Sequence, residues 1–331
     1  MNLASLRYLV ALHEHQHFGR AALACHITQP ALSNALRALE AELGTAIVKR
    51  GRSYAGLTPE GALVLASARR MLHEREHLQQ ELDSGADAPQ GRLQLAAVPT
   101  AMPILARFAA LLQARHPGIV PVVRSLSSPE IEAGLDGLSL DLGLGYTDRL
   151  QAPAGGGGRL AALPQYTEHY FLLRRARRPG PSLQIGPPMP WADAAHLPLC
   201  LLTPEMHNRS IVDQAFAKAG ATVRPAIETN SITALALAVL AGEVCSVMPG
   251  ALVGTLQGEG ALQARPLAAP EVLTPIGFVR MPAERPPRAL RAALQLAGEP
   301  QWLAIAAAHS GRLARPVQAA PVRGRTSTRT A

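Results

Sequence analysis

The sequence predicts an α-helical N-terminal region followed by an α/β body, with one long helix between them. Three observations support this fold class. The chain has 331 residues, which exceeds the usual size of a single domain. Apolar residues recur at helical spacing through residue 58, whereas short apolar strand-like runs alternate with helical patterns after residue 92. We therefore expect an α plus α/β protein with at least two domains.

Composition limits the classes of protein that remain. There is no run of about 18 consecutive apolar residues and no secretory signal pattern, so we expect a cytoplasmic protein without membrane contact. The three cysteines, Cys25, Cys200 and Cys245, are far apart and odd in number, which is typical of reduced thiols. The net charge is +8, but residues 311–331 carry five arginines and no acid. The overall charge is therefore weak evidence for a nucleic-acid partner.

Residues 1–58 should form a small bundle of three helices. The first helix is predicted by "LASLRYLVALHEH" and the second by "FGRAALACH", and both have helical apolar spacing. The third helix should begin after Thr28, because Thr28 is a good N-cap and Pro30 is tolerated in the first turn. Its apolar face, predicted to point to the core, consists of Leu32, Leu36, Leu39 and Leu43.

The opposite face of the third helix is polar but has no carboxylate before Glu40. Such a face suits the major groove of DNA, where Gln or Asn pairs with adenine and Arg pairs with guanine. The alternative is an ordinary solvated surface. Two helices around a short turn, followed by the basic segment "VKRGR", form a helix-turn-helix with a wing, which favours DNA. The predicted contacts are Thr28, Gln29, Pro30, Ser33, Asn34 and Arg37 to the bases, and Lys49, Arg50 and Arg52 to the backbone.

Residues 59–83 should form a long linker helix. Its apolar residues fall on alternating four- and three-residue steps, which indicates a seam between two helices and hence a homodimer. The alternative is that this face packs on its own chain. The segment 84–92 contains Gly, Pro, Ser and Asp and is predicted to be a linker. The seam residues are Val64, Ala68, Met71, Leu78 and Leu82.

Residues 93–308 have the alternation of an α/β fold. Two strands on either side of the helix "AMPILARFAALLQARHPG" form a βαβ unit, which predicts a parallel sheet. The glycine run Gly155–Gly158 lacks the Lys-Ser/Thr of a phosphate loop and is expected to be a surface loop. The basic tail, 309–331, is expected to be disordered. Further strands are predicted at "DLGLGY", "HYFLLRR", "PLCLLTP", "CSVMP" and "PIGFVRM".

The run "FGRAALACHITQPALSNALRALEAELG", followed by "VKRG" and "LTPEG", resembles the N-terminal signature of LysR-type transcriptional regulators. The resemblance continues through about residue 308. It implies a winged helix-turn-helix, a dimerising linker helix, and an effector domain of two α/β subdomains of the periplasmic-binding-protein type, with the dimers forming a homotetramer. Subdomain I would comprise about 93–163 and 268–308, and subdomain II about 164–267. Asn34 occupies a variable recognition position, and Val48 stands where Phe is common.

Ligands of α/β binding folds collect at the carboxyl ends of strands and the N-termini of helices, where unpaired N–H groups favour anions. The residues at such places are Thr100, Ser127, Ser128, Thr203, Thr229 and Asn230. Each is also explained as a simple helix cap. The resemblance predicts that they converge on a small effector, an anion or carboxylate, with Met248 and Pro249 on the far wall.

Two other functions fit part of the sequence. His13-Glu14-His15-Gln16-His17 matches the zinc-protease pattern H-E-x-x-H, but that pattern needs an unbroken helix, and here a new helix should start at Phe18. A thiol redox sensor using Cys200 and Cys245 is the second alternative, although thiols in apolar strands react slowly. No nucleophile, base and oxyanion set is evident, so we expect no enzyme, no metal and no cofactor.

Overall fold

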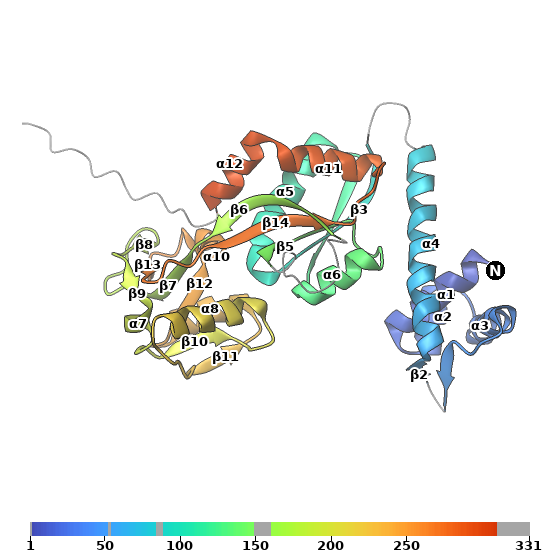
Figure 1. Cartoon of the computed structure of the whole chain (residues 1–331), viewed down its shortest axis with the longest axis horizontal. Coiled ribbons are helices and arrows are strands. Elements are labelled where there is room, and N and C mark those ends of the chain that lie inside the picture. The colour runs from blue at the N-terminus through green and yellow to red at the C-terminus, as the bar shows by residue number, and fades with distance from the viewer. Residues whose placement is uncertain (1, 52–53, 84–88, 149–159, 310–331) are drawn as a thin grey trace, which may run out of the picture.

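The computed structural model describes residues 2–51, 54–83, 89–148 and 160–309 (Figure 1). The predictions for Arg52, for the glycine run Gly155–Gly158 and for the tail beyond His309 lie outside these residues. No helix in the described part of the chain is both long enough and apolar enough to cross a membrane.

The N-terminal domain contains α1 (Leu3–His15), α2 (Phe18–Ala24) and α3 (Gln29–Leu43), followed by the hairpin of β1 (Val48–Arg50) and β2 (Tyr54–Leu57). Its core joins Leu6, Leu9 and Leu12 of α1 to Leu32, Leu36 and Leu39 of α3. Leu43 was predicted to join this core, but it is 40 % exposed. It is the last helical residue before Gly44, whose left-handed conformation ends α3 beyond the packed turns.

Helix α4 (Pro59–Asp83) is a long rod that stands between the N-terminal helices and the α/β body (Figure 1). Its first half packs on the N-terminal core: Ala68 is fully buried there and Val64 packs against it. The prediction that Ala68 belongs to a seam between two chains is therefore wrong, because Ala68 is fully buried in the core of its own chain. The place of the half-buried Val64 in a seam stays a prediction. Met71, Leu78 and Leu82 further along the helix are 40 %, 61 % and 72 % exposed.

The first sheet of the body has the strand order β4-β3-β5-β14-β6. Helices lie on both of its faces, and Phe108 of α5 packs against Phe278 of β14 and Trp302 of α12. We call this unit subdomain I. Its elements are β3 (Gly91–Ala97), η1 (Pro99–Ala101), α5 (Met102–Arg115), β4 (Ile119–Ser125), α6 (Ser128–Asp136), β5 (Leu142–Tyr146), β6 (Ala161–Glu168), β14 (Thr274–Arg280), α11 (Arg288–Gly298) and α12 (Pro300–His309).

The second sheet has the order β11-β10-β12-β7-β13-β8, and β9 also pairs with β13. We call this unit subdomain II. Its elements are β7 (Tyr170–Arg175), β8 (Gln184–Ile185), β9 (Met189–Pro190), α7 (Trp191–Ala194), β10 (Leu199–Leu202), α8 (His207–Lys218), β11 (Ile227–Thr229), α9 (Ile232–Ala241), β12 (Cys245–Pro249), α10 (Gly250–Val253), η3 (Gly254–Leu256) and β13 (Leu262–Ala268).

Both sheets are mixed, so the prediction of a parallel sheet is only partly right. β3 pairs in parallel with β4 and β5, but β14 is antiparallel to β5 and β6. The chain passes between the sheets twice, from β6 to β7 and from β13 to β14, and the strands that arrive this way run against their neighbours. Antiparallel neighbours need no crossover helix, so the βαβ pattern does not reveal them. Strand β6 continues in the first sheet as far as Glu168, so subdomain I extends beyond the predicted boundary at about residue 163.

Candidate functional site

The outer face of α3 is polar, exposed and free of carboxylates. Thr28 caps the helix by accepting a hydrogen bond from the Ala31 N–H. Gln29, Pro30, Asn34 and Arg37 are exposed, and Ser33 is half-buried. An Arg37 guanidinium N–H donates to the Asn34 side-chain oxygen at 3.3 Å, which holds these two groups side by side. This face therefore presents donors and acceptors that can reach base edges in a major groove.

Glu40, the first acid on α3, is half-buried and bonds to the backbone that follows the helix. Its Oε1 accepts hydrogen bonds from the backbone N–H groups of Ile47 and Val48 at 2.9 and 3.1 Å. The carboxylate thus ties α3 to the base of the β1–β2 wing. Lys49 on β1 is exposed. Arg50 belongs to β1, but its side chain, like Arg52, lies outside the described residues.

The H-E-x-x-H pattern is interrupted by a break between helices. α1 ends at His15, Gln16 has a left-handed φ of 52°, and His17 is the N-cap of α2. The His17 Nδ1 accepts from the N–H groups of Gly19 and Arg20. His13 and His17 therefore do not lie one turn apart on one helix, which is the arrangement a zinc-protease helix needs.

Replacing Arg37 by Ala is expected to weaken sequence-specific DNA binding by about 1–3 kcal/mol, because one bidentate base contact is lost. Folding should be unchanged, since the side chain is exposed. A gel-shift titration at fixed salt, on DNA selected by the wild-type protein from a random pool, measures the change. Arg177→Ala, at an exposed site in the body, is the matched control. Equal affinity of the Arg37 variant and wild type would exclude this residue from base recognition.

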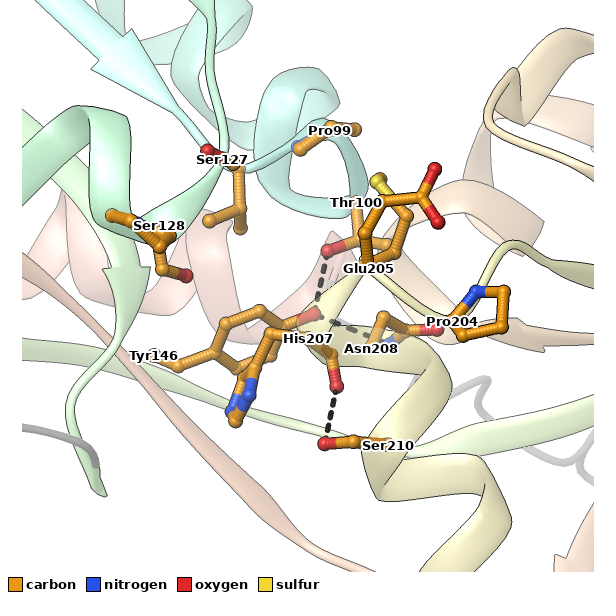
Figure 2. A pocket seen from close by; sticks show the side chains of 13 residues that line it. Pro99, Thr100, Ser127, Ser128, Tyr146, Pro204, Glu205, His207, Asn208 and Ser210 are labelled. Carbon is orange, nitrogen blue, oxygen red and sulfur yellow. Dashed lines mark hydrogen bonds between the residues drawn. The ribbon is translucent and has the colours of Figure 1, made fainter.

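A cavity of about 210 Å³ lies between the two subdomains (Figure 2). Subdomain I contributes the residues that follow β3 and β4 and the last residue of β5, and subdomain II contributes the segment that leads into α8. Of the predicted effector residues, Thr100, Ser127 and Ser128 line this cavity. The full lining is Val98, Pro99, Thr100, Ser127, Ser128, Pro129, Tyr146, Pro204, Glu205, Met206, His207, Asn208 and Ser210.

Hydrogen bonds cross the cavity floor from one subdomain to the other. The hydroxyls of Thr100 and Tyr146 are 2.9 Å apart. Asn208 of α8 donates to the Tyr146 hydroxyl at 3.2 Å and to the Tyr170 hydroxyl at 3.3 Å. Tyr170 in turn lies 3.2 Å from the Thr274 hydroxyl on β14. Tyr146, Tyr170 and Asn208 are not among the predicted effector residues. Tyr146 is nevertheless the last residue of an apolar strand, and the carboxyl ends of strands are where ligands of α/β folds collect.

The remaining predicted effector residues do not line this cavity. Thr203 stands just before it and donates to Glu205 at 2.7 Å. Thr229 and Asn230 lie at the end of β11, where the Thr229 hydroxyl accepts from the Ser231 N–H. Met248 is in the apolar core on one side of the second sheet, and Pro249 is buried at the end of β12.

Glu168 is a buried carboxyl at the crossing from β6 to β7. Its Oε1 accepts from the Ala251 N–H at 2.9 Å, and its Oε2 accepts from the Tyr166 hydroxyl at 3.4 Å. Burial raises the pKa of Glu168 to about 8, because the charged form loses hydration and the two hydrogen bonds compensate only in part. Glu168 is opposite Thr274 in the first sheet, so it sits where both connections between the subdomains pass.

The two body cysteines are on neighbouring strands but on opposite faces of the second sheet. Cys200 of β10 is opposite Ser246 of β12, one position out of register with Cys245. Accordingly Cys200 packs in one apolar core and Cys245 in the other. Burial raises the pKa of both thiols, so each carries less thiolate at neutral pH. Side chains on opposite faces cannot approach to the Cβ separation that a disulfide requires.

Comparison with known proteins agrees with both parts of the chain. Residues 3–62 match the model described as "Bacterial regulatory helix-turn-helix protein, lysR family", and residues 86–302 match the "LysR substrate binding domain". The DNA-binding transcriptional dual regulator OxyR of Escherichia coli K12 is 28 % identical over 291 residues, which cover 85 % of this chain and 90 % of that protein. A probable hydrogen peroxide-inducible genes activator of Mycobacterium avium is 31 % identical over 284 residues, covering 84 % and 87 %.

Solved structures show the same fold. Full-length OxyR from Pseudomonas aeruginosa, with a cysteine-to-aspartate substitution, has a TM-score of 0.65 at 24 % identity and covers 89 % of this chain and 97 % of that one. Full-length CbnR in complex with its target DNA also has a TM-score of 0.65, at 21 % identity, and covers 93 % and 100 %. The family models span the helix-turn-helix and most of the α/β body. The chain therefore belongs to the LysR family of DNA-binding transcriptional regulators.

Proposed function

We propose that this regulator responds to a small effector, an anion or carboxylate, that binds between subdomains I and II. One observation carries the proposal. The Ser128 hydroxyl lines the cavity, its residue is only 7 % exposed, and it has no hydrogen-bond partner among the described residues. A buried hydroxyl without a hydrogen-bond partner makes folding less favourable, because it has lost its bonds to water. A ligand that forms a hydrogen bond with the hydroxyl offsets this cost.

The DNA-binding unit we propose is a homodimer joined through the exposed part of α4, with two dimers forming a tetramer. Met71, Leu78 and Leu82 supply the apolar contacts, and dimerisation places two recognition helices at the fixed spacing that double-stranded operators require. A bacterial DNA-binding regulator of this kind works in the cytoplasm, where the DNA is. We assign it no catalytic activity.

The effector would act by changing how the subdomains close on one another. Because the cavity takes residues from both, a ligand that fits one closure angle better favours that angle. The ligand would not contact Gln29 or Arg37, so it would leave the affinity of each DNA-binding domain for its half-site unchanged. It would instead shift where the pair of DNA-binding domains of one dimer lies relative to the pair of the other dimer. By linkage, the ligand changes the free energy of operator binding by the difference between its binding free energies to the two closure states of the subdomains. Such differences are typically about 1–3 kcal/mol.

Thr100→Val is expected to abolish the effector response and to leave DNA binding without effector as it is in wild type. The substitution keeps the side-chain shape but removes the hydroxyl that lies 2.9 Å from Tyr146 on the cavity floor. The measurement is a footprint on selected DNA, with and without a panel of small carboxylates and amino acids. Thr255→Val, whose hydroxyl bonds to the Leu252 carbonyl outside the cavity, is the control. Equal ligand-dependent changes in wild type and Thr100→Val would remove Thr100 from the site.

A redox-sensing regulator is the second candidate, because relatives such as the Mycobacterium avium protein are described as hydrogen peroxide-inducible activators. The opposite-face placement of Cys200 and Cys245 argues against a disulfide between them. We expect hydrogen peroxide to leave the intact mass and the free-thiol count of the purified protein unchanged. A loss of two mass units, or a peroxide-dependent change in DNA affinity that Cys200→Ser and Cys245→Ser remove, would establish the redox function instead.

A further inference from the structure

Charge in the effector cleft is unevenly distributed. Among the described residues that line the cavity, Glu205 is the only acid and there is no Lys or Arg. Burial, together with the nearby Asp148 carboxylate, raises the pKa of the Tyr146 hydroxyl at the cavity floor. A ligand that carries only negative charge would therefore meet the Glu205 carboxylate, with no Lys or Arg in the described lining to offset it.

The N-termini of α6 and α8, which face the cavity from the two subdomains, differ in how they are capped. At α6, the Glu130 carboxylate accepts from the Ser127 N–H at 2.8 Å and from the Ser127 hydroxyl at 2.6 Å, so a carboxylate from the chain already occupies that end. At α8, the N-cap residue Met206 makes no side-chain cap. The Arg209 N–H in this first turn donates to the Met206 carbonyl at 2.9 Å. The end of α8 thus has no side-chain cap, and its helix dipole favours an external carboxylate there.

Glu205 lies directly before this end of α8. Its Oε1 accepts the Thr203 hydroxyl at 2.7 Å, and this hydrogen bond lowers the pKa of Glu205, so the group is ionised at neutral pH. Figure 2 shows the Glu205 carboxylate on the opposite side of the cavity from Ser127 and Ser128. The cleft therefore has a carboxylate beside an electropositive helix end, and a buried hydroxyl at its far side.

We propose that the cleft binds a small zwitterion with an ammonium and a carboxylate on one carbon atom, as in an α-amino acid. This inference rests on the proposed effector function and narrows its ligand class. The ligand carboxylate binds the first turn of α8, its ammonium group binds Glu205, and a polar group at its other end bonds to Ser128. The cavity volume of about 210 Å³ leaves room for a ligand of this size.

The experiment compares three sets of probes on the full-length protein by thermal shift and calorimetry. The sets are the twenty proteinogenic L-amino acids, the same molecules without the amino group, and the same molecules without the carboxylate. We expect at least one amino acid to bind about tenfold more tightly than both of its truncated forms, because each truncated form lacks one charge-assisted hydrogen bond.

Two variants locate the contacts. Glu205→Gln should remove the preference for the amino acid over its deaminated form, whereas the control Glu243→Gln, at another exposed glutamate, should keep it. Ser128→Ala should weaken binding of the amino acid. Both glutamates are exposed, so the variants should fold, and the melting temperature without ligand checks this.

The outcomes separate this inference from the effector function. If deaminated carboxylates bind as tightly as amino acids to wild type, the zwitterion proposal is wrong and the small-carboxylate effector stands. If an amino acid binds but Glu205→Gln leaves its preference unchanged, the ammonium site is not at Glu205 and the proposal is overturned. If no member of any set binds, both the zwitterion proposal and the proposed effector function fail.

Discussion

Leu78→Glu is expected to convert the dimer to monomers. The Leu78 side chain is 61 % exposed in the isolated chain and lies on α4 with Leu82 and Met71. In a homodimer joined through α4, a glutamate at this position would place an unpaired charge in an apolar seam, at a cost of several kcal/mol. Since each 1.4 kcal/mol is tenfold in affinity, the dissociation constant of the dimer should rise about 100-fold or more. Light scattering coupled to size-exclusion chromatography measures the mass.

Two controls separate the interface from a general effect of the substitution. Leu78→Met keeps an apolar side chain and should remain dimeric or tetrameric. Leu273→Glu places the same charge at an exposed leucine in the body, which is 49 % exposed, and should also leave assembly unchanged. Leu78 additionally lines a groove between α4 and subdomain I, so the melting temperature of the variant must stay near that of wild type. A mass that remains that of a dimer or tetramer would refute the seam.

The loss of dimers should also change DNA binding in a specific way. A monomer keeps the α3 face and so keeps its affinity for a half-site, but it loses the gain from binding two half-sites at once. We therefore expect Leu78→Glu to bind the full selected sequence little better than a half-site. Arg37→Ala differs, because it should weaken binding to the half-site as well as binding to the full sequence.

Local signals predict the N-terminal domain well. Thr28 and Pro30 mark the start of α3, and the helix begins at Gln29. The spacing of Leu32, Leu36 and Leu39 predicts its buried face. Periodicity does not say which partner covers an apolar face, however. Ala68 follows the same spacing as Leu78, yet α1 covers Ala68 and leaves Leu78 exposed, which depends on the tertiary packing of α4.

The body shows where local signals are insufficient. β6 was not predicted, because Pro164 interrupts its apolar alternation; it is an edge strand, where proline is tolerated. Thr100 and Ser128 could be predicted, because they follow the carboxyl ends of strands, and both line the cavity. Asn208 could not be predicted in this way, because it lies inside α8. Asn208 reaches Tyr146 across 62 positions of sequence, so its place depends on how the two subdomains meet.

The position of Glu168 makes the stability of the body depend on pH. In the unfolded chain this carboxyl ionises near its ordinary pKa of about 4.3, whereas in the folded chain its pKa is about 8. Below the unfolded value both states hold the proton. Between the two values the folded state binds more protons than the unfolded state, so its stability falls as pH rises, by about 1.4 kcal/mol for each pH unit at most. Above the folded value both states are ionised and the loss is complete.

Glu168→Gln is therefore expected to become more stable relative to wild type as pH rises from 6 to 8, by about 2–3 kcal/mol. The glutamine carries no charge at any pH, and its side-chain oxygen still accepts the Ala251 N–H that Glu168 holds at 2.9 Å. Urea or thermal unfolding of both proteins across this range measures the difference, and Glu243→Gln is the exposed control. Parallel pH profiles of wild type and Glu168→Gln would mean that Glu168 is already ionised in the fold. Diverging profiles would show that a neutral carboxyl is held where the chain passes between the subdomains.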